Sequence, residues 1–358
     1  MERVYNFAAG PGVLDESVLI SARDELLNYK GSGMSVMEMT HRGKVFQEIF
    51  DTAKNNLKEI MNVPDTHEVI FMQGGATLQF AAVPMNLIGT MSADYAVTGN
   101  FSNKAYKEAK KYGTTNISYS SESFGHDRIP KQEELKFTED SSYFYYCANN
   151  TIYGTEWNYV PKANAPIVCD MSSDILSKEV DVSKFGLIFA GAQKNMAPAG
   201  LTVVIADKSL LGRAMPITPE VMDYSVMVKH DSMLNTPPCW CIYMLSLTTD
   251  WIKRMGGLKE MEKIKKERAS LIYDVLDNSS LYIPHAREDS RSDMNILFKT
   301  KSDELDAMFI KEAADKGLVN LKGHRITGGI RASLYNAMPI DGAKKLAEFM
   351  KEFEVKNV

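Results

Sequence analysis

The sequence predicts an α/β fold, in which helices cover a mostly parallel sheet. Short apolar runs of strand type alternate with amphipathic patterns of helical period along the first two thirds of the chain. This alternation is typical of parallel sheets whose strands are joined by crossover helices. The 358 residues are enough for two domains, or for one large α/β domain with a smaller partner.

The strands and helices expected in this part of the chain follow one another in order. Strands are expected at residues 68–72, 95–97, 143–147, 166–169, 187–190 and 201–206. Helices are expected at residues 45–61, 79–87, 103–112, 240–255 and 258–277.

The pattern changes after Asn278, where a smaller α+β unit is predicted. Its expected elements are a strand at 295–298, a helix near 304–316, a strand at 330–334 and a helix near 340–353. The N-terminal residues 6–12 are expected to pack against this unit. We therefore predict a large domain of residues 16–260 and a small domain made of residues 1–15 and 261–358.

Composition and charge restrict the class of protein. Hydrophobic residues make up 44% and charged residues 24% of the chain, which is ordinary for a soluble globular protein. The net charge of −5 gives no basic surface for nucleic acid, although local Arg and His clusters can still bind an anionic substrate. No apolar run is long enough to cross a membrane and the N-terminus does not resemble a signal peptide, so we expect a cytoplasmic protein.

The four cysteines are too few for a disulfide framework in a chain of this length. Cys147 and Cys169 lie in apolar runs and are expected to be buried thiols. Cys239-Trp-Cys241 has the wrong spacing for a zinc site, and no paired Cys or His follows it. We expect a reduced protein without a bound metal.

Lys194 is the first candidate for chemistry. It lies between the apolar runs 187–190 and 201–206, in a turn of small residues. Its amine is therefore expected in apolar surroundings, where a lysine is difficult to keep charged and can attack a carbonyl. A lysine that forms a Schiff base with pyridoxal phosphate is the first hypothesis. A solvated turn lysine is the more common role for such a residue considered alone.

Asp170 strengthens this hypothesis. It follows the apolar run 166–169 directly, at the carboxyl end of an expected parallel strand, where α/β sheets bind ligands. An Asp in such a position often caps a helix. The functional alternative is that it pairs with the pyridine nitrogen of pyridoxal phosphate and keeps the ring protonated as an electron acceptor. Lys194 and Asp170 together indicate this cofactor more strongly than either residue does alone.

A phosphate-binding turn is predicted at Gln73-Gly-Gly-Ala-Thr77, between an expected strand and an expected helix. Backbone N–H groups at the helix start and the hydroxyl of Thr77 can bind a phosphate, and the glycines allow close approach. An ordinary tight turn is the alternative. The turn matches neither of the glycine-rich nucleotide-binding motifs, so a nicotinamide oxidoreductase is disfavoured.

Two further segments fit the same ligand. Phe101 follows the strand at 95–97 and can stack on a flat ring, or act as a core aromatic. In Asn235-Thr-Pro-Pro238 the hydroxyl of Thr236 can reach a phosphate, although Thr236 can equally cap a helix that starts at Pro237.

Basic residues that can bind an anion occur in two doublets and at one strand. The doublets are His41-Arg42 and His324-Arg325, and surface ion pairs are the alternative for each. Arg331 opens an expected strand and can hold a carboxylate with two hydrogen bonds, or form a structural salt bridge.

These residues resemble the phosphoserine aminotransferase family of pyridoxal-phosphate enzymes, over essentially the whole chain. The most specific motifs are Ser35-Val-Met-Glu38 with His41-Arg-Gly-Lys44, Gly191-Ala-Gln-Lys-Asn195, Asn235-Thr-Pro-Pro238, and Lys322-Gly-His-Arg325 with residues 329–336. The resemblance implies the aspartate-aminotransferase-like fold (fold type I). It also implies a homodimer with active sites at the subunit interface.

The resemblance implies roles for individual residues. Lys194 is expected to be the Schiff-base lysine, Asp170 the partner of the pyridine nitrogen, and Arg331 the ligand of the substrate α-carboxylate. Positions that contact the cofactor match Ala76, Thr77, Phe101, Thr151, Gln193, Asn235 and Thr236, the last two supplied by the neighbouring subunit. Positions that receive the distal phosphate or carboxylate match His41, Arg42, His324 and Arg325.

Two residues depart from the pattern of the family. The family often has tryptophan where this chain has Phe101, so ring stacking is expected to persist over a smaller area. Many bacterial members have arginine where this chain has Thr77. We expect either a weaker hold on the distal anion or a larger share for the remaining Arg and His residues.

The implied reaction is reversible amino transfer from L-glutamate to 3-phosphohydroxypyruvate, which gives O-phospho-L-serine and 2-oxoglutarate in serine biosynthesis. Both amino acids carry an α-carboxylate and a distal anion, so one site can accept each in turn. Three alternatives stay open: another fold type I enzyme such as an alanine–glyoxylate aminotransferase or a desulfurase, a nicotinamide oxidoreductase, and a binding protein without activity. The resemblance also leaves open a second substrate from vitamin B6 synthesis, which would give 4-phosphohydroxy-L-threonine.

Overall fold

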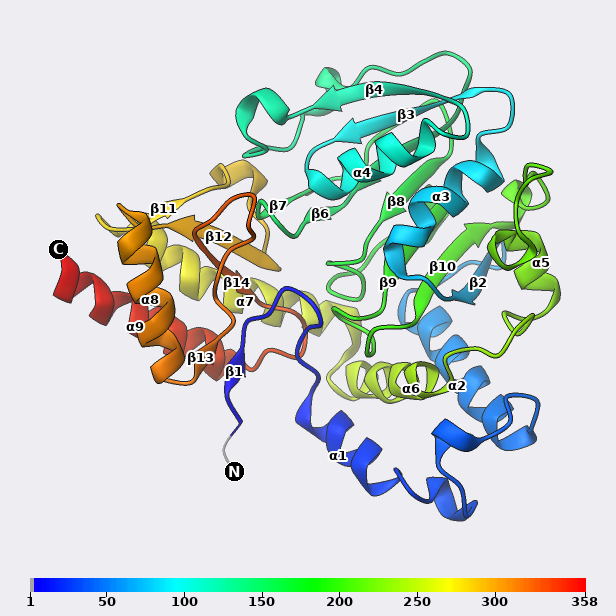
Figure 1. The fold of residues 1–358 in the computed structure, drawn as a ribbon, viewed down its shortest axis with the longest axis horizontal. Helices are drawn as coiled ribbons and strands as arrows, with labels where there is room; N and C mark the ends of the chain where they lie inside the picture. The colour runs from blue at the N-terminus through cyan, green and yellow to red at the C-terminus, as the bar shows by residue number, and fades with distance from the viewer. Residues whose placement is uncertain (1–2) are drawn as a thin grey trace.

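The structure, a computed structural model, describes residues 3–358, and a seven-stranded sheet forms its centre (Figure 1). The strands lie in the order β2 (His67–Met72), β10 (Thr202–Asp207), β9 (Leu187–Gly191), β8 (Ile167–Asp170), β5 (Ser141–Cys147), β3 (Ser92–Val97) and β4 (Thr114–Ser120). Within this sheet β10 runs antiparallel to both of its neighbours, and the other pairings are parallel. The prediction of an α/β fold with a mostly parallel sheet is confirmed.

Helices cover both faces of this sheet because alternate residues of each strand point to opposite sides. In β2, Val69 and Phe71 pack in one core, whereas Ile70 and Met72 pack in the other. The first core includes α1 (Glu16–Asp24), α2 (Lys44–Ile60) and α6 (Cys239–Arg254), and the second includes α3 (Gly75–Leu87), α4 (Asn100–Ala109) and α5 (Tyr224–Lys229).

A second, smaller sheet lies beside the first (Figure 1). It contains the antiparallel strands β11 (Ile283–Pro284), β12 (Asn295–Lys299) and β14 (Ile330–Ser333). A third core forms between this sheet and the helices α7 (Gly257–Asp277), α8 (Asp303–Asp315) and α9 (Ile340–Asn357). The strand β1 (Tyr5–Asn6) pairs in parallel with β13 (Leu318–Val319), which confirms that the N-terminal segment packs against this part.

The predicted elements are present, with ends that differ by at most four residues. The sequence pattern does not predict α1, α5 or β4. Helix α4 begins at Asn100, so Phe101 lies in its first turn. Helix α6 begins at Cys239 with Pro238 before it, so the alternative that Thr236 caps this helix is wrong.

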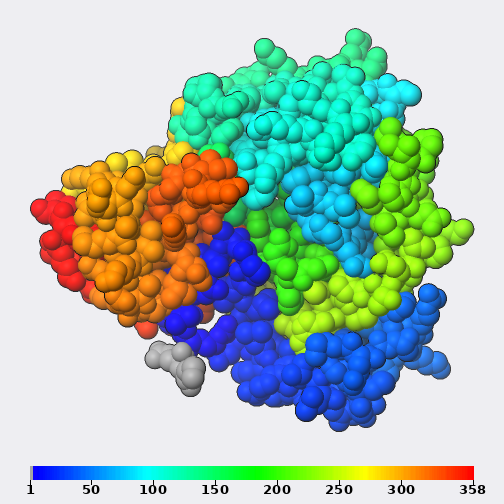
Figure 2. All heavy atoms as spheres, viewed as in Figure 1, coloured from blue at the N-terminus to red at the C-terminus, as the bar shows by residue number. Residues whose placement is uncertain are grey.

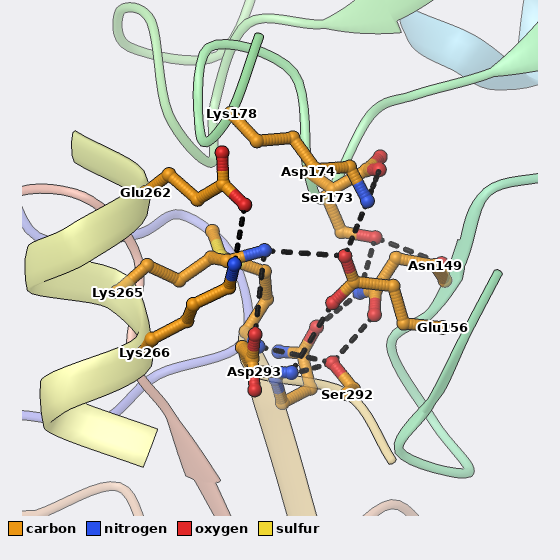
Figure 3. Close-up of polar contacts among 12 residues, drawn as sticks. Asn149, Glu156, Ser173, Asp174, Lys178, Glu262, Lys265, Lys266, Ser292 and Asp293 are labelled. Carbon is orange, nitrogen blue, oxygen red and sulfur yellow. Dashed lines mark hydrogen bonds and ion pairs between the residues drawn. The ribbon is translucent and has the colours of Figure 1, made fainter. Parts of the chain in front are cut away.

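A buried cluster of charged side chains connects the larger sheet to the smaller one (Figure 3). Glu156, in the short strand β7 (Thr155–Glu156), accepts hydrogen bonds from Lys178 at 2.6 Å and from Lys265 of α7 at 3.3 Å. Lys265 also lies 3.4 Å from Asp293, and its side chain is 2% exposed. Burial alone would raise the pKa of Glu156, but the two lysines lower it below its ordinary value. The cluster is therefore a set of paired charges.

We expect Lys265→Met to destabilise the protein by about 3 kcal/mol, because Glu156 and Asp293 would each lose the ion pair with Lys265. The free energy of unfolding from urea titration measures this loss. Lys263→Met is the matched control, because Lys263 lies on the same helix with its side chain 72% exposed. A loss no larger than that of the control would show that the cluster does not stabilise the junction.

Candidate active site

A cavity of about 620 Å³ lies beside the carboxyl end of β9. Its walls come from parts of the chain that are far apart in sequence, and these parts meet on the face shown in Figure 2. Six of the predicted site residues line it: Phe101, Thr151, Gln193, Lys194, His324 and Arg331. The structure therefore brings the central part of the predicted site together.

Lys194 lies in the turn between β9 and β10, as the sequence predicts. Its Nζ donates a hydrogen bond to Thr151 Oγ1 at 2.7 Å and lies 5.5 Å from the ring centroid of Phe101. Burial lowers the pKa of Lys194, Asp170 opposes this shift, and the charge of Arg331 adds to it. The uncharged amine, which is the nucleophilic form, is therefore populated at lower pH than in an ordinary lysine.

Asp170 is the last residue of β8, the strand next to β9. It is 3% exposed, and its Oδ1 accepts a hydrogen bond from the backbone N–H of Ser172 at 2.9 Å. Burial raises the pKa of Asp170, whereas Ser172 and Lys194 lower it. Because β8 and β9 are parallel neighbours, the carboxylate and the amine reach the same edge of the sheet.

The N-terminal segment closes one side of the cavity. The backbone N–H of Gly12 donates to the carbonyl of Gln193 at 2.7 Å. A Cβ at Gly12 would lie 2.6 Å from the carbonyl oxygen of Lys194 and 2.7 Å from the ring of Tyr335, so only glycine fits here. Tyr335 donates to the carbonyl of Ala9, a cavity residue, at 2.6 Å. The sequence gives no sign of this contact, because Ala9 and Tyr335 are far apart in the chain.

The predicted phosphate-binding turn also reaches the cavity. Gly74 and Gly75 line it, and both adopt positive φ, +84° and +66°. Helix α3 begins at Gly75, so its first unpaired N–H groups belong to this turn. Ala76 is half-buried and Thr77 is exposed, and Thr77 lines a neighbouring hollow that shares Gly74 with the cavity.

Eight predicted site residues do not line this cavity in their own chain: Asp170, Ala76, Thr77, His41, Arg42, Asn235, Thr236 and Arg325. Asn235 and Thr236 are exposed, and the carbonyl of Thr236 accepts a hydrogen bond from Gln73 at 3.0 Å. Nε2 of His41 is buried without a hydrogen-bond partner among residues 3–358.

The residues in and beside the cavity fit pyridoxal phosphate. Lys194 offers an amine that pairs with a hydroxyl rather than with a carboxylate. Asp170 is a buried carboxylate whose pKa is raised by burial, and a protonated ring nitrogen would supply a cationic partner for it. The helix start at Gly75 provides N–H groups for a phosphate.

Comparison with known proteins agrees with this geometry. The family model named aminotransferase class-V matches residues 4–346. A phosphoserine aminotransferase from Bacillus cereus is 48% identical over 359 residues, which cover both chains completely. The chain belongs to the phosphoserine aminotransferases of the class-V family.

Solved structures show the same fold over the whole chain. A phosphoserine aminotransferase from Bacillus circulans subsp. alkalophilus matches with a TM-score of 0.98, 41% identity and complete coverage of both chains. A phosphoserine aminotransferase with bound PLP from Trichomonas vaginalis matches with a TM-score of 0.93 and 38% identity, over 98% of this chain and 100% of that one. An alanine–glyoxylate aminotransferase from Nostoc sp. is 13% identical with a TM-score of 0.77, which shows the fold alone. The predicted fold type is confirmed.

No helix within residues 3–358 is long and apolar enough to span a membrane. No group of three or more His, Cys, Asp or Glu side chains in the same residues is arranged to hold a metal ion.

We expect substitutions of the charged neighbours to shift the pKa of Lys194 in opposite directions. Asp170→Asn removes the charge that raises this pKa, so the pKa falls further, whereas Arg331→Met removes a charge that lowers it, so the pKa rises. The Cε chemical shift of ¹³C-labelled lysine, followed against pH in the cofactor-free protein, measures both shifts. Loss of the signal in Lys194→Met assigns it. Shifts in the same direction would contradict this electrostatic account.

Proposed function

We propose that the chain catalyses reversible amino transfer from L-glutamate to 3-phosphohydroxypyruvate with bound pyridoxal phosphate, giving 2-oxoglutarate and O-phospho-L-serine. The observation that carries this proposal is the placement of Lys194 and Asp170 at one sheet edge, beside a cavity that Lys194 and Arg331 both line. The relatives that share this whole chain at 41% and 48% identity are named phosphoserine aminotransferases. The reaction belongs to serine biosynthesis, and we expect it in the cytoplasm.

The chemistry that bound pyridoxal phosphate supplies is a carbonyl for the amino group and a ring that accepts electrons. Lys194 holds the cofactor and then moves the proton at Cα of the substrate, because its lowered pKa makes the free amine available as a base. Asp170 keeps the ring nitrogen protonated. Thr151 orients Lys194 through the hydrogen bond at 2.7 Å.

Arg331 is the proposed ligand of the α-carboxylate that both amino acids carry. Its Nη1 donates to the carbonyl of Thr151 at 3.4 Å, and its Nε is buried without a hydrogen-bond partner among residues 3–358. Burial lowers the pKa of Arg331, as expected of a cation that lacks a carboxylate. A substrate carboxylate would supply this missing partner.

The distal anion of the substrate meets a different group of residues. His324 lines the cavity, and burial together with the nearby cations Arg331, Arg325 and Lys104 lowers its pKa. A phosphate or carboxylate is favoured at such a position, because it offsets several positive charges. Thr77 and Phe101 are the residues at which this site departs from relatives with arginine and tryptophan.

A homodimer accounts for the predicted residues that lie outside the cavity of their own chain. We propose that Asn235 and Thr236 contact the cofactor phosphate of the neighbouring subunit, with Ala76 and Thr77 at the α3 start. His41 and Arg42 would complete the anion site in the same way, which would give His41 Nε2 a partner, whereas Arg325 lies near His324 of its own chain.

We also propose the division into a large domain (16–260) and a small one (1–15 and 261–358). The cores support it, since Leu258 and Met261 of α7 pack with the large sheet whereas Ala269 and Ile272 pack with the small one.

The purified protein with pyridoxal phosphate should use 3-phosphohydroxypyruvate far better than hydroxypyruvate, its unphosphorylated analogue. The reason is that the cations around His324 are satisfied only by a distal anion. Production of 2-oxoglutarate from glutamate measures both rates. Equal rates, or a preference for glyoxylate with alanine as donor, would reject the proposal in favour of an alanine–glyoxylate type of enzyme.

Hybrid dimers test whether the site is shared. Lys194→Ala and Arg42→Ala homodimers should each lose most activity, because each lacks a group in both sites. In a mixed dimer, one site would combine native Lys194 of one chain with native Arg42 of the other, so activity should return on refolding the two together. No recovery in verified mixed dimers would contradict the assignment of Arg42 to the partner's site.

A further inference from the structure

We propose that Asn295 is a positioning residue that sets where Arg331 stands relative to Lys194, and so determines affinity for the α-carboxylate. The proposal rests on the function proposed above, in which Arg331 binds that carboxylate. Asn295 is the first residue of β12 and is 0% exposed. It does not line the cavity, so it would act through its neighbours.

The register of the small sheet puts Asn295 on the same face as Arg331. In the antiparallel pair of β12 and β14, Asn295 lies opposite Ser333, and Leu297 lies opposite Arg331. Side chains two residues apart on a strand share a face, so Ser333 and Arg331 point to the same side. The alternate residues Ile296 and Phe298 pack in the third core. The face with Asn295 is therefore the one turned away from that core.

Both the side-chain nitrogen and the side-chain oxygen of Asn295 form hydrogen bonds. Its Nδ2 donates to Ser333 Oγ at 2.9 Å and to the hydroxyl of Tyr335 at 3.3 Å. Its Oδ1 accepts from Nδ2 of Asn149 at 2.8 Å. One side chain thus holds the strand that carries Arg331, a tyrosine that supports the cavity wall at Ala9, and a residue of the larger part of the chain.

Asn149 continues this network toward the edge where Asp170 and Lys194 lie. It belongs to β6 (Asn149–Asn150), which follows β5, and its Nδ2 also donates to Ser173 Oγ at 2.8 Å. Ser173 is three residues after Asp170. Ser292 donates to Asn149 Oδ1 as well, and Figure 3 shows Asn149 between Ser173 and Ser292, next to the Glu156–Lys265 cluster.

The turn that carries Thr151 contacts β12 directly. A Cβ at Gly154 would lie 2.8 Å from the carbonyl oxygen of Asn295 and 3.1 Å from the backbone nitrogen of Leu297. This close approach brings Thr151 to Arg331, whose Nη1 lies 3.4 Å from the Thr151 carbonyl. Thr151 also accepts from Lys194. Thr151 therefore contacts both Lys194 and Arg331, and the turn that carries Thr151 packs against the backbone of Asn295.

A purely structural role for Asn295 makes a different prediction. A buried polar network costs desolvation and is retained where it specifies one arrangement of the groups it joins. If Asn295 only stabilised the fold, its loss would leave the affinity for both ligands unchanged or weaken both equally. If it positions Arg331, its loss weakens ligands that have an α-carboxylate and spares those that do not.

The test compares O-phospho-L-serine with O-phosphoethanolamine, which lacks the α-carboxylate, by calorimetric binding to the pyridoxal-phosphate enzyme. We expect Asn295→Ala to weaken O-phospho-L-serine about tenfold and to leave O-phosphoethanolamine nearly unchanged. In steady-state assays, KM for glutamate should rise by a similar factor, with a smaller change in kcat.

Asn86→Ala is the matched control. Asn86 is 4% exposed and, like Asn295, donates two hydrogen bonds and accepts one, to Ala82, to Met222 and from Tyr224, away from the cavity. It should lower the unfolding temperature in the same way without this ligand selectivity. If Asn295→Ala does not fold, Ser333→Ala, which removes one of its hydrogen bonds, should show the same selectivity to a smaller extent.

Equal weakening of both ligands, or unchanged affinity for O-phospho-L-serine, overturns the positioning role. Either result together with an active native enzyme leaves the proposed function intact. A native enzyme that is inactive with 3-phosphohydroxypyruvate rejects that function instead, and the selectivity of binding still decides the role of Asn295.

Discussion

The site depends on one constraint: an amine must be kept in surroundings that disfavour its charge, close to a carboxylate that favours it. Burial lowers the pKa of Lys194 while Asp170 opposes the shift. If the carboxylate contacted the amine directly, the ion pair would hold the proton and remove the nucleophile. The structure avoids this contact, because the hydrogen-bond partner of Lys194 is the neutral hydroxyl of Thr151.

The same constraint accounts for the close packing of the N-terminal segment against the turn that carries Lys194. Gly12 has space only for a hydrogen beside the backbone of Lys194, so the N-terminal segment packs tightly over the turn. The segment can reach this place because β1 is paired with β13 of the smaller part, which anchors it between the two sheets.

Much of this was predictable from sequence, and the failures have physical reasons. The central strands are apolar on both faces, so their runs predict them well, whereas β4 (Thr114–Ser120) is a polar edge strand and gives no such signal. Lys194 and Asp170 were recognisable because Asp170 ends one apolar strand and Lys194 lies in the turn that follows the next. The Asn149–Asn295 pair was not, since the two residues are 146 positions apart and neither has a distinctive neighbourhood in sequence. The division of the site between two chains came from resemblance alone, because a sequence pattern does not say which copy supplies a side chain.

The polar contacts between the two sheets bear on how one site can accept two different amino acids. An apolar junction would tolerate small sliding of one part against the other, since dispersion contacts have little directional preference. The Glu156–Lys265 pair and the Asn149–Asn295 pair are directional, so they favour one relative position of β12 and the turn after β6. Arg331 projects from the smaller sheet and Lys194 from the larger one. Two amino acids with different distal groups share only their α-carbon and α-carboxylate, so the distance between these two residues is the one that must suit both. A directional polar junction is the means by which this chain keeps that distance constant.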